Sequence, residues 1–484
     1  MKKLKKIFAL VLAAAMVLAM NLTAFAAEDG NTYMITAPDN DHIYEVYQIF
    51  TGDYSGDVLT NIKWGKNGTG TTGEAVDSDI ITTLNGTTGS DTEKLNVIEP
   101  YVNLKSEAFG TVSKDSTLEV TGGYYLIKDV NNALDGKNDA YTLYIVQVAN
   151  DVTITPKADV PTFEKKLKDM DDTTNTMTGW QDGADWDIGD TIPFQLKGTV
   201  ADNYEDYDSY MFVFHDQESG GLDFDPESVV VKVDNTTISA GYEVVTEDLS
   251  DDCTFEIRFE DLKEIEQVQA GSVITAEYNA TLNENAVIGS KGNPNKAKLE
   301  FSNNPNDEQG GKGETTWDTV IVFTYKTVIN KVDSGNTPLT GAAFKLEKNK
   351  NGTWTTVKEF TADDTTTTFS FEGLDDGTYK LTETATPAGY NTIDPIEFTI
   401  TATHDIISDN PTLSNLSGNA TTGEITFTAK KDEGSLTANV VNNSGLELPE
   451  TGGIGTTVFY ILGGILVIGA SVVLIVRRRM NTDK

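Results

Sequence analysis

Short runs of Val, Ile, Thr, Tyr and Phe recur throughout the body of the chain, and clusters of Gly, Asn and Asp separate them. Runs of this kind predict short β-strands, and the clusters between them predict turns. Helical periodicity is scarce, although residues 261–269 fit one short helix. We therefore expect an all-β protein built from β-sandwich domains in series.

Two changes in composition divide the 484 residues. Pro156 and Pro161 flank a polar patch, and a Gly/Asn-rich stretch at 303–313 precedes a new strand at 316–324. A chain of this length has room for roughly three domains, each with its own core. We expect an N-terminal domain at 27–156, a middle domain at 157–322 and a last domain at 323–446.

The first 26 residues have the pattern of a signal peptide. A basic start at residues 1–6 leads into an apolar run at 7–20, and Ala24-Phe25-Ala26 fits the small-x-small cleavage site. The apolar run is short for a membrane span, which favours cleavage over a retained N-terminal anchor. The mature, exported chain is expected to begin at Ala27.

The other end, residues 447–484, combines three features in a fixed order. An apolar stretch at 454–476 is long enough to cross a bilayer, and the arginines at 477–479 would hold its end in the cytoplasm. A pentapeptide precedes the stretch: Leu448, Pro449, Glu450, Thr451 and Gly452. Together these features resemble the LPxTG cell-wall sorting signal. The resemblance implies that a sortase cleaves between Thr451 and Gly452, holds the Thr451 carbonyl as a thioester and transfers it to an amine, which attaches the protein to the peptidoglycan of a Gram-positive cell wall.

Net charge and cysteine content limit which partners and which covalent links the protein can have. The formal net charge of -39 argues against nucleic acid as a partner. Cys253 is the one cysteine, so an internal disulfide is impossible. It falls on the apolar face of a predicted strand with Phe255 and Ile257, as expected of a buried structural thiol rather than a reactive one. An exported chain without disulfides raises the question of what other covalent link stabilises it.

Motifs in all three domains resemble those of Gram-positive pilins. The last domain is similar to the B-type repeat of collagen adhesins and contains a match to the pilin E-box, at 331–333, 338–346 and 379–390. The middle domain resembles the isopeptide-forming domain of fimbrial backbone proteins, at 161–165, 188–191 and 301–305. The N-terminal domain looks like the leading domain of the same pilins, at 42–50 and 123–127. The resemblance implies tandem immunoglobulin-like sandwiches of the collagen-adhesin type in a sortase-assembled pilus.

The two isopeptide-forming families link a lysine to an asparagine between the first and last strands, with help from an Asp or Glu. Such chemistry requires burial, because desolvation keeps the lysine neutral and the carboxyl group protonated. The three residues should therefore interrupt the apolar faces of strands.

In the last domain, strand alternation puts three polar residues among apolar ones: Lys331, Glu383 and Asn442. Unpaired burial of such groups is costly, which favours a shared site over an ordinary surface lysine and a solvated glutamate. In the middle domain the same alternation selects Lys165 and Asn303. The carboxylate there is either Asp216, which we favour, or Asp190. Whether the N-terminal domain has its own bond stays open.

Polymerisation needs an acceptor amine for the Thr451 acyl group. Pilin families place this lysine in a motif ending Tyr-Pro-Lys, and here Thr155-Pro156-Lys157 has Thr in the first position. Lys157 lies at a predicted domain junction, where proline stiffens the approach. It is the expected acceptor; the alternative is a solvated linker lysine.

Three functions from different classes follow. The first is a backbone pilin joined head to tail from Thr451 to Lys157, with sortase, neighbouring copies, peptidoglycan and host surface or matrix proteins as partners. The second is a monomeric wall-anchored adhesin or ancillary pilin. The third, a wall-attached enzyme, is disfavoured because the three histidines have no metal-ligand spacing and no nucleophile elbow occurs. We expect no cofactor or metal, and the acidic turn at 169–172 is expected to be solvated because it lacks the Gly and Glu of an EF-hand loop.

Overall fold

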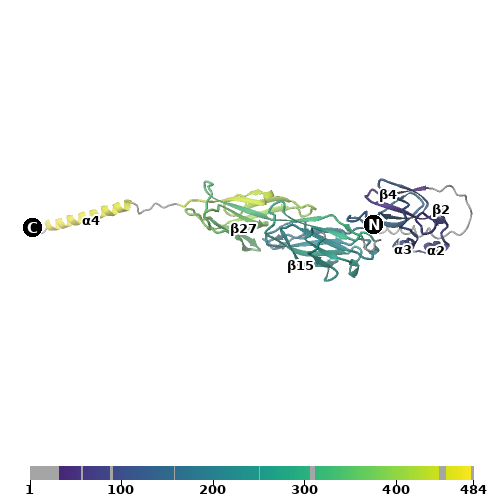
Figure 1. Cartoon of the computed structure of the whole chain (residues 1–484). Coiled ribbons are helices and arrows are strands. Elements are labelled where there is room, and N and C mark those ends of the chain that lie inside the picture. Colours follow the sequence, from purple (N-terminus) through teal and green to yellow (C-terminus); the bar gives the residue numbers. More distant parts are fainter. Residues whose placement is uncertain are drawn as a thin grey trace.

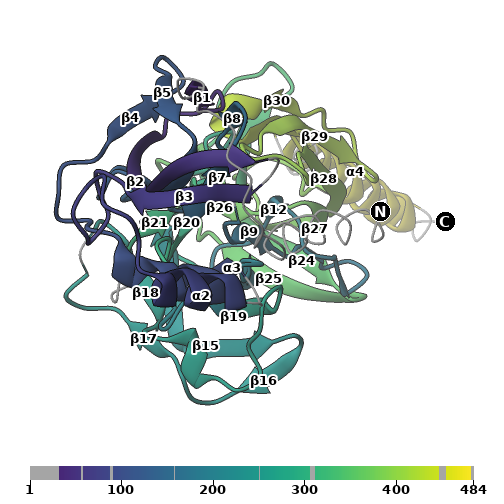
Figure 2. The same ribbon diagram turned by 90° about the vertical axis from the view of Figure 1, so that its right-hand side faces the viewer.

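The computed structural model describes residues 32–55, 58–87, 91–156, 159–249, 251–305, 311–445 and 454–480. Strands dominate it, in three units that follow one another along a single axis (Figure 1). Helix α4 (Ile454–Met480) lies at the end of the row opposite the N-terminal domain. Figure 2 looks onto the N-terminal domain from its own end of that axis.

The N-terminal domain holds two sheets and a helical insertion. Strands β3-β2-β6-β7 form one sheet, with β4 also on β2, and β5-β1-β8 form the other. Helix α2 begins after Asp77, whose side chain caps it by accepting from the Asp79 backbone NH. The elements are β1 (Thr32–Thr36), β2 (Ile43–Ser55), β3 (Val58–Trp64), α2 (Ser78–Gly86), α3 (Asp91–Ile98), η1 (Glu99–Tyr101), β4 (Gly110–Ser113), β5 (Leu118–Thr121), β6 (Gly123–Asp129), β7 (Leu143–Val148) and β8 (Val152–Thr153).

The middle domain is a sandwich of two sheets, β12-β22-β20-β14-β18-β17 with β21 on β20, and β16-β15-β19-β13-β9. Buried aromatic side chains such as Phe194, Phe214 and Tyr278 fill the space between them. The elements are β9 (Thr162–Leu167), β10 (Met170–Asp171), β11 (Thr176–Met177), β12 (Gly183–Asp185), β13 (Thr191–Thr199), η2 (Tyr204–Asp206), β14 (Phe212–Glu218), β15 (Leu222–Val233), β16 (Thr236–Ile238), β17 (Glu243–Val245), β18 (Phe255–Phe259), η3 (Leu262–Glu264), β19 (Val273–Leu282), β20 (Asn293–Phe301), β21 (Gly313–Glu314) and β22 (Asp318–Phe323).

The helix expected at 261–269 is wrong in length. Only the single 3-10 turn η3 (Leu262–Glu264) forms, and Ile265 after it is already extended. Leu262, Ile265 and Val268 are all buried. One turn followed by extended chain is therefore enough to bury the apolar residues whose spacing suggested a helix.

The last domain is a second sandwich, of sheets β26-β23-β31-β30 and β25-β24-β27-β28-β29. Its first strand, β23, pairs in parallel with its last strand, β31, with Asp333 opposite Asn442. The elements are β23 (Tyr325–Asp333), β24 (Ala343–Lys350), β25 (Thr353–Glu359), β26 (Thr368–Leu374), β27 (Gly377–Ala385), β28 (Ile396–His404), β29 (Leu413–Ala420), β30 (Thr428–Lys430), η4 (Lys431–Glu433) and β31 (Ser435–Asn442). The two ends of the domain thus meet in one sheet.

Backbone hydrogen bonds join each domain to the next. The Tyr141 NH of the N-terminal domain donates to the Asn303 carbonyl over 2.8 Å. The Ile188 NH of the middle domain donates to the Gly373 carbonyl over 3.0 Å. Gly373 has a φ of +76°, and a side chain there would meet Ile188 at 2.6 Å, so this close approach requires glycine.

The C-terminal helix α4 has the composition of a membrane span. Its segment Val458–Arg479 is long and apolar enough to cross a bilayer. Arg477, Arg478 and Arg479 form its last turn. The span therefore ends in a positive cluster, as in a stop-transfer segment whose end stays in the cytoplasm.

Candidate functional site

The last domain brings Lys331 of β23, Glu383 of β27 and Asn442 of β31 into direct contact. Lys331 and Asn442 are fully buried, and Glu383 is nearly so. The Lys331 Nζ donates to the Asn442 Oδ1. The Asn442 Nδ2 in turn donates to both Glu383 oxygens, over 2.9 and 3.1 Å. The Lys331 Nζ also lies 3.3 Å from the Glu383 Oε1, which closes the triangle.

This geometry suits attack of an amine on a side-chain amide. Burial lowers the pKa of Lys331 and so favours the neutral, nucleophilic amine, against the opposing pull of Glu383. The Nζ sits at the carboxamide it would attack, and the Glu383 carboxyl group contacts the nitrogen that would leave as ammonia. The amine, the amide and the acid–base group are all in place within one buried site.

Strand alternation explains why these residues meet. Thr327, Ile329 and Lys331 are the inward-facing residues of β23, and all three are buried. The parallel register then brings the end of β31 alongside the end of β23. Because a first and a last strand can be neighbours in a sandwich, residues 111 positions apart in sequence come into contact.

The middle domain has a second buried lysine site, built around Lys165 of β9. The Lys165 Nζ donates to the Asp216 Oδ2 over 2.5 Å and to the Tyr278 OH over 2.7 Å. The Tyr278 OH donates to the same Asp216 oxygen over 2.8 Å. Asn295 of β20 completes the group, because its Nδ2 donates to the Tyr278 OH over 2.9 Å. All four side chains are buried.

The electrostatics of this second site resemble those of the first. Burial lowers the pKa of Lys165 and raises the pKa of Asp216. Within the described chain, the Asn295 Oδ1 and the Asp216 Oδ1 are buried and have no hydrogen-bond partner. Buried oxygens without hydrogen-bond partners lower the stability of a core. A reaction that consumes the asparagine amide would change the surroundings of these two oxygens.

Asn303, the asparagine expected beside Lys165, lies elsewhere. Its Nδ2 donates to the backbone oxygens of Leu134 and Asp139 in the N-terminal domain, over 3.1 and 3.2 Å. Asp216 of β14 lies opposite Ala297 of β20. Asn295 is two residues away from Ala297 along the chain, whereas Asn303 is six residues away. The structure thus places Asn303 at the N-terminal domain, and Asn295 is the asparagine that joins the Lys165 network. Both residues have the same strand parity, so alternation alone did not separate them.

Of the two candidate carboxylates, Asp216 is the one that contacts Lys165 directly. Asp190 lies at the junction with the last domain, 3.7 Å from the Lys350 Nζ. Cys253 is half-buried, and burial raises the pKa of its thiol, which agrees with an unreactive cysteine. No described side chain of a lysine in the N-terminal domain is fully buried, so the structure adds no third site of this type there.

The proposed polymerisation residues lie outside the described residues. This applies to the acceptor Lys157, to the signal peptide at 1–26 and to the sorting motif: Leu448, Pro449, Glu450, Thr451 and Gly452. The described chain approaches the acceptor through β8 and the buried Ile154. The backbone segment before Lys157 is thus fixed against the N-terminal core.

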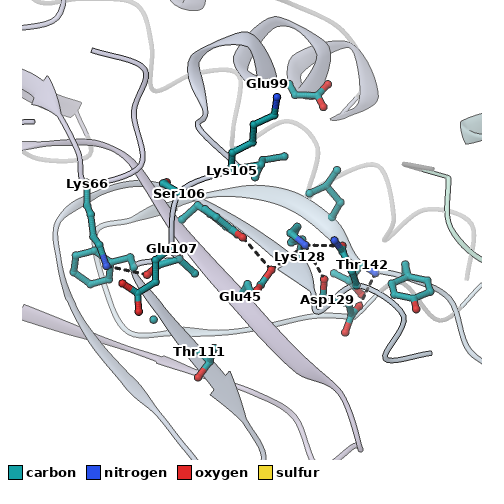
Figure 3. Close-up of a pocket in the computed structure, with 18 of the residues that line it drawn as sticks. Glu45, Lys66, Glu99, Lys105, Ser106, Glu107, Thr111, Lys128, Asp129 and Thr142 are labelled. Atoms are coloured by element: carbon teal, nitrogen blue, oxygen red, sulfur yellow. Dashed lines mark hydrogen bonds and ion pairs between the residues drawn. The ribbon is translucent and has the colours of Figure 1, made fainter. Parts of the chain in front are cut away.

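A polar hollow of about 740 Å³ lies on the N-terminal domain (Figure 3). Lys128 on its wall pairs with Glu45 over 2.9 Å. Lys66 donates to the Ala108 carbonyl over 2.9 Å. These two lysines are occupied by partners, and the hollow contains none of the residues of the two lysine–asparagine sites.

Three sequence families match parts of the chain. Residues 188–305 match the Gram-positive pilin backbone subunit 2, a Cna-B-like domain. Residues 326–412 match a prealbumin-like fold domain, and residues 441–482 match the LPXTG cell wall anchor motif. The chain thus combines a match to the pilin backbone family with a cell wall anchor motif. All three families are structural or anchoring rather than catalytic, and the anchor places the protein on the Gram-positive cell surface.

Known pilins share the arrangement over most of their length. The trypsin-resistant surface T6 protein of Streptococcus pyogenes serotype M6 is 25% identical, with 95% of this chain and 96% of the relative aligned. The structure of the T6 backbone pilin aligns with a TM-score of 0.53 at 18% identity, covering 87% of this chain and 100% of that one. The full-length major pilin SpaD from Corynebacterium diphtheriae aligns with a TM-score of 0.50 at 17% identity, covering 87% and 99%. At these identities the structural likeness shows the fold alone.

Proposed function

We propose that this protein is the shaft subunit of a covalent surface pilus. A sortase joins Thr451 of one copy to Lys157 of the next, and the final copy is transferred to peptidoglycan. The observation that carries the proposal is a backbone-pilin domain at 188–305 in the same chain as an LPXTG anchor at 441–482. The alignment with a streptococcal surface pilin over 95% of the chain supports it.

An internal bond from Lys331 to Asn442 would carry tension across the last domain. Force along a shaft enters this domain at the start of β23 and leaves it after β31. With Lys331 Nζ bonded to the Asn442 side chain, the force passes directly from one strand to the other. The sandwich between them then bears no load, so its hydrogen bonds are not pulled apart.

The reaction at this site is an amide exchange without an external reagent. The neutral Lys331 Nζ forms a bond to the Asn442 side-chain carbon, the bond from that carbon to Nδ2 breaks, and ammonia leaves. Glu383 moves the proton from the attacking nitrogen to the leaving one. In the entropy model for crosslinks, closing a loop of this length stabilises the fold by about 4–5 kcal/mol.

In the middle domain the corresponding bond would join Lys165 to Asn295, with Asp216 as the proton-transferring carboxyl group. The support is the burial of all three residues and the contact network through Tyr278. This bond would take residues 166–294 out of the load path. Together the two bonds would replace the disulfides that a chain with one cysteine cannot form.

Co-expression with the partner sortase tests the shaft proposal. We expect a ladder of multimers that survives boiling in SDS, and Lys157→Ala should abolish it. The matched control is Lys63→Ala, which removes an exposed lysine of the N-terminal domain and should leave the ladder intact. A ladder that persists in Lys157→Ala would overturn the acceptor, and a wild-type protein that stays monomeric would favour the wall-anchored adhesin.

A further inference from the structure

The junction between the middle and last domains contains an unusual number of carboxylates. The acidic turn that we expected to be solvated lies in this junction. Seven aspartates gather there, five from the middle domain and two from the last: Asp169, Asp172, Asp185, Asp187, Asp190, Asp375 and Asp376. Two groups among them differ in how their charge is compensated.

The first group surrounds a buried lysine. The Lys348 Nζ lies 2.7 Å from the Asp172 Oδ2 and 2.8 Å from the Asp187 Oδ2, and it also contacts Asp375. Burial acts to lower the pKa of Lys348, but the three carboxylates outweigh it and raise that pKa. Lys348 therefore stays charged and is the counterion of this group.

The second group is Asp169, Asp185 and His404, and here no lysine contact is present among the described residues. The His404 Nε2 lies 3.8 Å from the Asp169 Oδ2, and its Nδ1 lies 3.8 Å from the Asp185 Oδ1. At 3.8 Å these contacts are too long to be hydrogen bonds. One donor atom from each residue lies within 4.8 Å of the other two.

A backbone NH group donates a hydrogen bond to each of the two carboxylates and so fixes its orientation. The Met170 NH donates to the Asp169 Oδ1 over 2.9 Å, and the Asp376 NH donates to the Asp185 Oδ2 over 3.1 Å. In each case it is the other oxygen that lies 3.8 Å from the His404 ring. Each carboxylate thus has one oxygen near the His404 ring, that of Asp169 near Nε2 and that of Asp185 near Nδ1.

The imidazole supplies an independent indication of a ligand. The His404 side chain is only 9% exposed. Its Nδ1 is buried and has no hydrogen-bond partner in the described chain. A neutral imidazole carries a lone pair on one of its two ring nitrogens. A buried lone pair beside two carboxylates is costly unless a proton or a cation occupies the space between them.

We propose that Asp169, Asp185 and His404 bind one divalent transition-metal ion of the Zn²⁺ type across this junction. One imidazole nitrogen and two carboxylate oxygens suit Zn²⁺ or Mn²⁺, whereas Ca²⁺ takes six to eight oxygen ligands. Bonds of about 2.0–2.2 Å to the metal require the three donor atoms, which lie within 4.8 Å of one another, to move closer together. Water completes the coordination.

Such an ion would join two domains that the proposed internal bonds leave unjoined. Asp169 precedes β10 and Asp185 ends β12, both in the middle domain, while His404 ends β28 of the last domain. Lys165–Asn295 and Lys331–Asn442 each lie within one domain. The metal would therefore stiffen the hinge between two covalently tied units, whether or not the chain polymerises.

Calorimetric titration of the mature chain, residues 27–451, with ZnCl₂ after removal of metals by chelation tests the proposal. We expect one Zn²⁺ per chain, and weakening by roughly tenfold or more in His404→Ala and in Asp185→Asn. The control Asp409→Asn removes an exposed carboxylate of the same domain and should bind as the wild type does. No binding by the wild type, unchanged binding in both site variants, or tighter binding of Ca²⁺ than of Zn²⁺ would each overturn the proposal.

Two further measurements distinguish the junction from a second group of potential ligands. His215, Asp251 and Cys253 also lie close enough to hold an ion, so Cys253→Ser is titrated in parallel and should bind normally. Co²⁺ bound at the junction should show no thiolate charge-transfer band. Zn²⁺ should raise the Tm of the wild type but not that of a folded His404→Gln variant. Binding lost in Cys253→Ser but kept in His404→Ala would place the ion at Cys253 and overturn the proposal.

Discussion

Lys331 and Lys348 lie in the same domain, and both are fully buried, yet their surroundings favour opposite protonation states. Lys331 faces one carboxylate and one amide, and burial lowers its pKa. Lys348 faces three carboxylates, which raise its pKa despite burial. The difference shows that burial alone does not make a lysine reactive. A neutral amine needs few opposing charges, and an isopeptide bond also needs an amide within reach.

The largest effect should come from removing the acid at the Lys331 site. Glu383→Gln keeps the shape of the side chain but cannot transfer the proton, so the bond should not form. We expect a loss of about 4–5 kcal/mol in unfolding free energy, from the open loop. Chemical denaturation measures it, with Glu359→Gln, an exposed glutamate of the same domain, as the control. Equal stability of the two variants would show that Glu383 is not needed for the bond.

Loss of the internal bond of the middle domain should have a comparable effect, and it shows which asparagine forms that bond. Asn295→Ala should abolish the bond to Lys165, so that its intact mass, corrected for the substitution, exceeds that of the wild type by one ammonia. Asn303→Ala should leave that bond in place and lose only its two hydrogen bonds to the N-terminal domain. Tryptic mapping of the crosslinked peptides distinguishes the two. A Lys165–Asn303 crosslink would restore the expectation from sequence.

Replacing Lys348 should destabilise the protein without changing any covalent bond. Lys348→Met removes the counterion of Asp172, Asp187 and Asp375. Breaking a buried ion pair costs about 3–5 kcal/mol, which a shift in the denaturation midpoint would report. Mass spectrometry should show the same number of internal bonds as in the wild type. Loss of a bond in this variant would mean that Lys348 is a reacting lysine.

A smaller, pH-dependent effect is expected at His42, a third buried cation. Its ring lies 2.9 Å from Asp129 and 2.6 Å from Asp139. Burial opposes protonation, but the two carboxylates prevail and raise the pKa of His42 from 6.5 to about 9. Its contribution to stability is therefore complete below pH 6.5 and is lost as pH rises through about 9.

Hydrogen exchange in the segment 129–141 measures this effect. Protection of that segment should fall between about pH 7 and 9.5 after correction for the intrinsic rate, and His42→Gln should remove the dependence. Protection that is independent of pH in the wild type would show that the ring is not the group involved.

Strand alternation predicted which side chains point inward, and little about where along a strand they meet their partners. It found Lys331, Glu383 and Asn442, whose contact follows from one pairing of first and last strands. It selected Asn303 and could not distinguish that residue from Asn295, because both have the same parity and position along β20 depends on register with β14. Helices α2 and α3 were not anticipated, and both are short, with nine and eight residues.

Contacts between domains were beyond the reach of sequence patterns. The turn at 169–172 has the composition of a solvated loop, and only the docking of the last domain encloses it. His404 and Lys348 have no distinctive neighbours in sequence. Most of their partners come from the middle domain, 161 residues away in the case of Lys348 and Asp187. Sequence patterns within one segment do not predict which of its residues a second domain will bury.

The intact mass of the mature chain, residues 27–451, tests most directly whether buried lysines have reacted with asparagines. The account predicts a mass that falls short of the sequence by two ammonia molecules, one from Lys331 with Asn442 and one from Lys165 with Asn295. The Glu383→Gln variant, corrected for its substitution, should fall short by one. A wild-type chain with its full sequence mass would contradict the account.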